Sequence, residues 1–265
     1  QLRVAMPLGE TPWQVIAVEG NARLGGGAAE RAAKLRTGQH LRTDGGKVTL
    51  EADEIGRIEV AAGSELRVTE STAAKQTLSL RRGLIHALIW APPRRFVVDT
   101  PSARTIDLGC EYTLFVDDDG DGLIRVKTGW VAFQFDGRDS FIPAGAACRT
   151  TRRGGPGTPY FEEASQELRR ALAAFDASGN GGDLKQVLAE ARPRDGLTLW
   201  HLLTRAAEAD RGLVFDRFAT FVALPAEVTR EGVLAKDRRM LDLCWNALNL
   251  ENAEWWREWK RAWQP

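Results

Sequence analysis

The tightest group of residues that could do chemistry is an acidic run, Asp117-Asp118-Asp119-Gly120-Asp121-Gly122. Asp117, Asp119 and Asp121, followed by Gly122, match the first half of a calcium loop, in which alternating carboxylates converge on one hard cation. Thr128 stands at the twelfth position, where such a loop carries a bidentate acid. The alternative is a solvated hairpin turn, because Asp-Gly is a preferred turn dipeptide. We expect the turn and keep Ca²⁺ as a candidate ligand of the three aspartates.

Other patterns that support catalysis or metal binding are missing from the sequence. His40, His86 and His201 are isolated, and none has a metal-ligand partner three or four residues away. The chain contains no HExxH, GxSxG, phosphate-loop or dinucleotide-binding motif. We therefore expect structural histidines and a protein that is not an enzyme and has no catalytic or cofactor-binding residues.

The composition of the chain excludes several broad classes of partner. Its 265 residues are 43% hydrophobic and 27% charged, as in an ordinary globular protein. Basic and acidic residues number 36 each, so no global field gathers nucleic acid or an anionic membrane. No run approaches the roughly 18 apolar residues of a membrane span, and no signal peptide precedes the body. Because the sequence begins at Gln1, we expect any anchor or signal to lie upstream of it.

A change in composition divides the chain into two parts. Twenty of its 26 glycines lie in residues 1–160, whereas six of its nine tryptophans lie in residues 161–265. The first part has short alternating runs typical of half-buried strands, and the second has apolar residues at helical spacing. Gly154-Gly155-Pro156-Gly157 marks the turn between them. We predict an all-β domain with an N-terminal arm over 1–158 and an α-helical domain over 159–265.

The β-part contains a degenerate repeat of an apolar residue, a glycine three positions later and a second residue three positions beyond. Each copy predicts a strand, a corner at a residue that tolerates positive φ, and a new strand. Such corners fit a twisted β-solenoid, a sandwich of short strands, or an antiparallel meander with glycine turns. The six corner glycines are Gly38, Gly63, Gly83, Gly109, Gly129 and Gly145.

The ordered series of motifs over residues 30–150 resembles the FecR domain. The segments that carry this resemblance are Leu35-Arg36-Thr37-Gly38-Gln39-His40-Leu41-Arg42-Thr43, Gly63-Ser64-Glu65-Leu66-Arg67-Val68, Leu80-Arg81-Arg82-Gly83, Phe96-Val97-Val98-Asp99-Thr100-Pro101-Ser102-Ala103, Val126-Lys127-Thr128-Gly129-Trp130-Val131 and Pro143-Ala144-Gly145. The family writes a threonine after the glycine where this chain has Cys110, and Tyr112-Thr113-Leu114 contains one residue more than its pattern. No single motif is specific, but their order is.

Two cysteines near corner glycines are candidates for a disulfide within this FecR-like series. Cys110 and Cys148 lie one and three residues after Gly109 and Gly145. A bridge between them would require an oxidising compartment, which the resemblance supplies in the periplasm. The alternative is two reduced thiols in the core. Cys244 is expected to be a buried helix residue.

The resemblance implies a bacterial envelope protein that transmits a signal by protein contact. Proteins of this family have a cytoplasmic segment that holds a sigma factor, one membrane span, and a periplasmic FecR domain that receives a signal from a TonB-dependent transporter. Many end in a small α/β signalling module, whereas residues 161–265 of this chain show helical spacing instead. The transporter is therefore a weaker expectation than a protein partner in the cell envelope.

The second part predicts six helices, at about 161–176, 183–191, 197–210, 213–222, 237–249 and 251–263, in a small bundle or a HEAT-like array. Trp255, Trp259 and Trp263 are spaced by four, with Trp256 beside them. Such a stripe is a candidate interaction face, for a partner or for docking the terminal helix on its own domain.

We expect the periplasmic module of a membrane-anchored anti-sigma regulator. The alternative is an envelope scaffold or glycan-binding module without a sigma-factor link.

Overall fold

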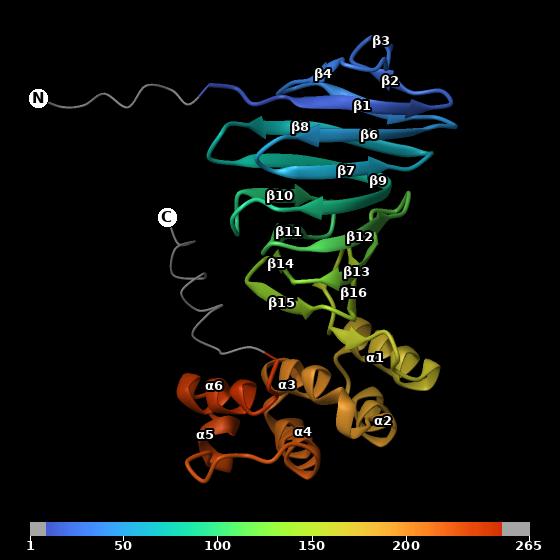
Figure 1. Ribbon diagram of the computed structural model, residues 1–265. Helices are drawn as coiled ribbons and strands as arrows, with labels where there is room; N and C mark the ends of the chain where they lie inside the picture. Colours follow the sequence, from blue (N-terminus) through green and yellow to red (C-terminus); the bar gives the residue numbers. More distant parts are fainter. Residues whose placement is uncertain (1–8, 251–265) are drawn as a thin grey trace, which may run out of the picture. The chain divides into compact units, whose positions relative to one another are not determined.

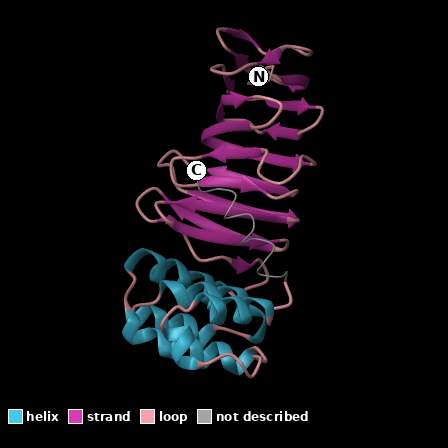
Figure 2. Ribbon diagram, turned by 90° about the vertical axis from the view of Figure 1, so that its left-hand side faces the viewer, coloured by secondary structure: helices cyan, strands magenta, loops and turns pink. Residues whose placement is uncertain are grey.

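The chain forms two compact units, Gln1–Gly157 and Thr158–Pro265, and this computed structural model describes residues 9–250 of them. The first, the β-unit, consists of strands, and the second, the helical unit, consists mainly of helices, shown in magenta and cyan in Figure 2. The expected order of a β-rich part followed by a helical part is therefore confirmed.

The strands of the β-unit pair in two sheets joined through β9, and they lie one above another from β3 to β16 (Figure 1). Sheet 1 contains β1 (Trp13–Glu19), β4 (Lys34–Leu35), β6 (Lys47–Ala52), β7 (Gly56–Val60), the second half of β9 (Gln76–Ile89), β12 (Glu111–Val116), β13 (Gly122–Thr128), β16 (Ala146–Thr151) and β17 (Gly155–Pro156). Sheet 2 contains β2 (Arg23–Leu24), β3 (Gly27–Ala28), β5 (His40–Thr43), β8 (Ser64–Ser71), the first half of β9, β10 (Phe96–Asp99), β11 (Arg104–Asp107), β14 (Trp130–Phe135) and β15 (Arg138–Pro143).

Strand direction separates this arrangement from a regular solenoid. In the described part of the two sheets, neighbouring strands pair antiparallel, except that β9 and β10 run parallel. A parallel β-helix stacks its coils in parallel register. The twisted β-solenoid expected from the sequence is therefore not confirmed, whereas strands joined by glycine corners are present.

The six predicted corner glycines all adopt positive φ, between 71° and 101°. Each lies where the chain passes from one sheet to the other. Gly63, for example, joins β7 of sheet 1 to β8 of sheet 2, and Gly145 joins β15 of sheet 2 to β16 of sheet 1. The prediction of corners is therefore confirmed. Glycine stands at these corners because positive φ costs other residue types more.

The corner at Gly83 differs from the others because it lies inside one continuous strand. The first half of β9 pairs with β8, and the second half pairs with β7 and β12. Gly83 has φ +101°, and a Cβ atom there would lie 2.5 Å from Cβ of Ser64. The Ser64 hydroxyl in turn accepts a hydrogen bond from the amide of Leu84 at 3.1 Å. Glycine therefore lets β9 cross between the sheets against the backbone of β8.

Trp13 in β1 joins the two sheets at the core. Its indole ring packs edge-on against Phe96 of sheet 2, with ring centroids 5.8 Å apart. The indole NH donates to Oε1 of Gln76 at 3.1 Å, and the Gln76 amide donates to the carbonyls of Thr11 and Thr72. Trp13 and Gln76 are fully buried. Burial of this polar side chain is tolerated because its donors and acceptor all have partners.

The helical unit begins with β18 (Tyr160–Phe161) and continues as α1 (Gln166–Ser178), α2 (Gly181–Glu190), the 3₁₀ turn η1 (Pro193–Asp195), α3 (Gly196–Arg205), α4 (Glu208–Phe221), α5 (Arg230–Leu234) and α6 (Arg238–Asn246). The sequence predicted one helix over 197–210, but α3 ends at Arg205 and α4 begins at Glu208. Arg211 of α4 is buried, and its guanidinium donates to the carbonyl of Ala206, in this break, and to that of Leu234. None of the described helices is both long and apolar enough to span a membrane.

Aromatic packing holds α3 against α6 inside the helical unit. The rings of Trp200 and Trp245 meet edge-on at 4.7 Å, and the Trp200 indole NH donates to the Leu241 carbonyl at 2.9 Å. His201 is buried beside them and bonds the Leu197 carbonyl through Nδ1 at 2.9 Å. Burial lowers the pKa of His201 to about 3, so the ring is neutral at physiological pH.

Gly83 and Gly63 provide a matched test of the corner at β9. Gly63 has φ +73° and open space around its Cα, so Gly63→Ala should cost only the backbone strain of about 1–2 kcal/mol. Gly83→Ala adds the collision with Ser64 and should cost about 1–3 kcal/mol more. Urea unfolding of both variants measures the difference. Equal losses of stability would show that β9 does not need the close approach.

Candidate interaction surface

The outer face of sheet 1 carries large apolar side chains that the described chain does not cover. Along the second half of β9, Ile85, Ala87 and Ile89 point into the core, while Leu84 and Leu88 point outward. This alternation follows from the two-residue period of a strand. Leu84 is 37% exposed and Leu88 is 42% exposed. Apolar side chains thus lie on both faces of the strand.

Strand pairing arranges three of the outward side chains in one row. Leu84 of β9 lies opposite Phe115 of β12, and Phe115 lies opposite Leu123 of β13. Residues directly opposite each other in antiparallel strands share one face of the sheet. Phe115 is 43% exposed, and Leu123 is partly exposed. We call Leu84, Phe115 and Leu123 the apolar row.

Charged side chains lie on the same face beside the apolar row. Glu111 accepts a hydrogen bond from Lys127 Nζ at 2.9 Å and lies 3.0 Å from Nε2 of His86. Its hydrogen bond to Lys127, then its contact with His86, lowers the pKa of the Glu111 carboxyl. The carboxylate is therefore ionised at neutral pH and fixes the end of Lys127 and the ring of His86. An apolar row bordered by oriented charges is typical of a protein-contact surface.

Trp90 extends the exposed apolar surface at the end of β9. Its ring is 48% exposed, and its indole NH donates to the Asp53 carbonyl at 2.8 Å. The hydrogen bond fixes the polar edge of the ring and leaves much of its apolar face in water. An amphipathic aromatic group held in this way is a frequent anchor in interfaces.

The predicted calcium site is not formed. The described residues contain no group of three or more His, Cys, Asp or Glu side chains placed to hold a metal ion. Asp117 Oδ1 accepts the Asp121 amide, and Asp121 Oδ1 accepts the Arg152 amide, both at 2.9 Å. The run is the turn between β12 and β13, as the alternative interpretation expected. The carboxylates of Asp117 and Asp121 satisfy backbone donors instead of converging with Asp119 on a cation.

The predicted disulfide between Cys110 and Cys148 is also corrected, since both are free and buried. β13 lies between β12 and β16, which places those two strands about 9–10 Å apart. Cys148 lies level with Leu114, four residues along the chain from Cys110. A disulfide requires Cα atoms within about 7 Å, so the two cannot be bridged. Cys244 is buried in α6, as expected.

The thiol of Cys110 instead contacts a buried acid at the corner that leads into β12. Asp107 is 1% exposed, accepts the Gly109 amide at 2.7 Å through Oδ1, and accepts the Cys110 thiol through Oδ2. Burial raises the pKa of Asp107 to about 7, although both hydrogen bonds act in the opposite direction. The hydroxyl of Tyr112 is buried nearby in sequence without a hydrogen-bond partner. The Asp107 carboxyl therefore gains or loses its proton near neutral pH.

Sequence reasoning missed the apolar row, although one signal was present. Leu84-Ile85-His86-Ala87-Leu88-Ile89-Trp90 is a nearly continuous apolar run, unlike the alternating runs elsewhere. A strand that is apolar on both faces is expected to be covered on both faces. His86 interrupts the run on the outward face, beside Glu111. The predicted Trp255, Trp256, Trp259 and Trp263 stripe lies outside the described residues.

Comparison with known proteins finds limited likeness. No family model matches the chain, and no curated protein matches it. Two crystal structures of a candidate anti-sigma factor from Parabacteroides distasonis ATCC 8503, at 1.65 and 2.50 Å resolution, are similar to part of it. They share 16% and 17% identity, over 51% and 50% of this chain and 64% and 63% of theirs, each with a TM-score of 0.41. Likeness at this level establishes neither a shared fold nor a shared function.

Asp107→Asn tests the buried proton, since it removes the charge and leaves an acceptor for the Gly109 amide. The folded-state pKa lies above the ordinary value of 3.8, so the stabilisation from the bound proton is complete below about pH 4. It is lost as the pH rises to about 7, by about 1.4 kcal/mol for each unit of pKa shift. Urea unfolding of both proteins from pH 4 to 8 should show the wild type losing stability relative to the variant. A constant difference would contradict the buried acid.

Proposed function

We propose that this chain is a periplasmic, FecR-like regulatory module that acts by binding another protein of the cell envelope. The exposed apolar row Leu84, Phe115 and Leu123 is the observation that carries the proposal. Removing these side chains from water favours association by roughly 25 cal/mol for each Å² of apolar surface buried. The charges around Glu111 would orient the partner, because oppositely charged surfaces select register and partner.

The ordered FecR-like motifs support the same proposal from the sequence. The glycines of these motifs occupy corners where the chain changes sheet, so the motif series follows the architecture of the β-unit. In the proposed protein an anchor upstream of Gln1 holds the module at the membrane. Its output is a change in binding or in exposure to proteolysis, which requires no bond chemistry and no cofactor. A sigma-factor system is the proposed recipient, and a TonB-dependent transporter is the proposed source of the signal.

A second candidate function rests on Trp90. An aromatic ring that is 48% exposed and fixed through its NH can stack on the apolar face of a sugar ring. A glycan-binding scaffold without a sigma-factor link would use this side chain and leave the apolar row unused. Binding of peptidoglycan fragments that is lost in Trp90→Ala and kept in Phe115→Glu would favour this alternative.

Phe115→Glu tests the regulatory function in the bacterium that encodes the full-length protein. A charge in the apolar row should weaken partner binding at least about tenfold, which corresponds to 1.4 kcal/mol. RNA sequencing should then show a set of promoters that responds to deletion of the gene and, in the same direction, to Phe115→Glu. Leu213→Glu is the matched control, because Leu213 in α4 is similarly exposed at 44%.

Two results would reject the regulator. One is a deletion strain without any coherent change in promoter activity. The other is an equal response to Phe115→Glu and Leu213→Glu, which would place the effect in general instability instead of the apolar row.

A further inference from the structure

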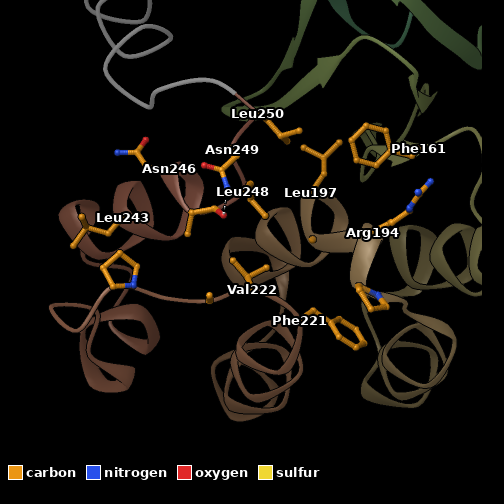
Figure 3. Close-up of a pocket in the computed structure, with 15 residues that line it drawn as sticks. Phe161, Arg194, Leu197, Phe221, Val222, Leu243, Asn246, Leu248, Asn249 and Leu250 are labelled. Carbon is orange, nitrogen blue, oxygen red and sulfur yellow. Dashed lines mark hydrogen bonds between the residues drawn. The ribbon is translucent and has the colours of Figure 1, made fainter.

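The helical unit contains an apolar groove of about 600 Å³ (Figure 3). Its walls come from α3, the end of α4, α6 and the turn that follows α6. The apolar side chains that line it include Leu197, Phe221, Val222, Leu243, Leu248 and Leu250. A groove of this volume is within the range that holds a drug-sized ligand or several large side chains.

The chemistry of the groove favours an apolar occupant. Arg194 is the one charged side chain among the fifteen residues that line it, and its guanidinium is already paired with Glu163 at 2.9 Å. Asn246 and Asn249 supply the polar groups near the turn after α6. Phe221, Leu243 and Leu248 are each partly exposed in the described chain. Covering these side chains would remove apolar surface from water without burying an unpaired charge.

The next residues of the chain have the matching pattern. Leu250 lines the groove, and residues 251–265 follow it in the sequence. Trp255, Trp259 and Trp263 are spaced by four, which places them on one side of a helix. An isolated helix of 15 residues is marginal in water and is stabilised mainly by packing its apolar side. The groove offers that packing at the point where the segment begins.

We propose that residues 251–265 bind in this groove of their own chain, with the tryptophan stripe against its apolar walls. A covalently attached segment has an effective concentration in the millimolar range, which favours it over a free ligand of the same chemistry. This inference is independent of the proposed function, because it uses no residue of the β-unit.

Hydrogen–deuterium exchange on the full chain tests the docking. In the wild type, amides of residues 251–265 should exchange at least tenfold more slowly than in an unstructured peptide of the same sequence. Leu243→Glu places a charge in the groove wall, and Trp259→Glu places one in the stripe. Each variant should abolish that protection and also speed exchange at residues 246–250. Leu213→Glu, at an exposed position of α4, should change neither region.

Four outcomes would overturn the proposal. Unprotected amides at 251–265 in the wild type would show an empty groove, and protection that survives Leu243→Glu would place the segment elsewhere. Protection that increases with protein concentration would identify a second copy as the occupant. Protection that appears only with vesicles of anionic lipid would identify a membrane-surface helix. Trp259→Glu changes no residue of the groove wall, so it still reports on docking if Leu243→Glu fails to fold.

Discussion

The β-unit depends on passing one chain repeatedly between two sheets through glycines with positive φ. At Gly83 this requirement is strict, because the backbone of β9 lies against Ser64 and no Cβ fits between them. The same strand then belongs to both sheets, so a shift on one side would be transmitted to the other. The contact of Trp13 with Phe96 and Gln76 closes the space that these crossings create.

The strand register set by these corners also determines which side chains are exposed to solvent. A one-residue slip in a strand exchanges its two faces. If β12 slipped by one residue against β9, Phe115 would turn inward and the buried Leu114 would turn outward. The exposed apolar row therefore depends on the corners that flank it at Gly83 and Gly109. In this sense the interaction surface and the fold have the same physical origin.

The corners could be predicted from the sequence because glycine has a distinct conformational range, and a repeated glycine pattern reports it directly. The absence of the Cys110–Cys148 disulfide could not be predicted, since the spacing of the two cysteines in the chain does not reveal that β13 lies between their strands. The expected turn at Asp117–Asp121 could be predicted, because Asp-Gly favours turns and a carboxylate such as that of Asp117 can satisfy a backbone amide. The break before α4 was missed because helical periodicity does not show that Arg211 is buried, with its guanidinium bonded to the Ala206 carbonyl in the break. The apolar row was not predicted because the sequence of a strand does not show whether another element covers its outer face.

The pairing of strands close together in the sequence has a consequence for the order of folding. No strand of the described β-unit pairs with one more than five places away along the chain, and β5 and β8 are joined over 25 residues at Leu41 and Leu66. Short loops have a low closure entropy, and low contact order accelerates folding of β-proteins. Much of the pairing in such a chain can form progressively from one end as it emerges, although the core contacts of Trp13 with Gln76 and Phe96 wait for β9 and β10. A protein delivered in an extended state through a narrow channel would gain from that property, because few unpaired strand edges would remain exposed during its passage.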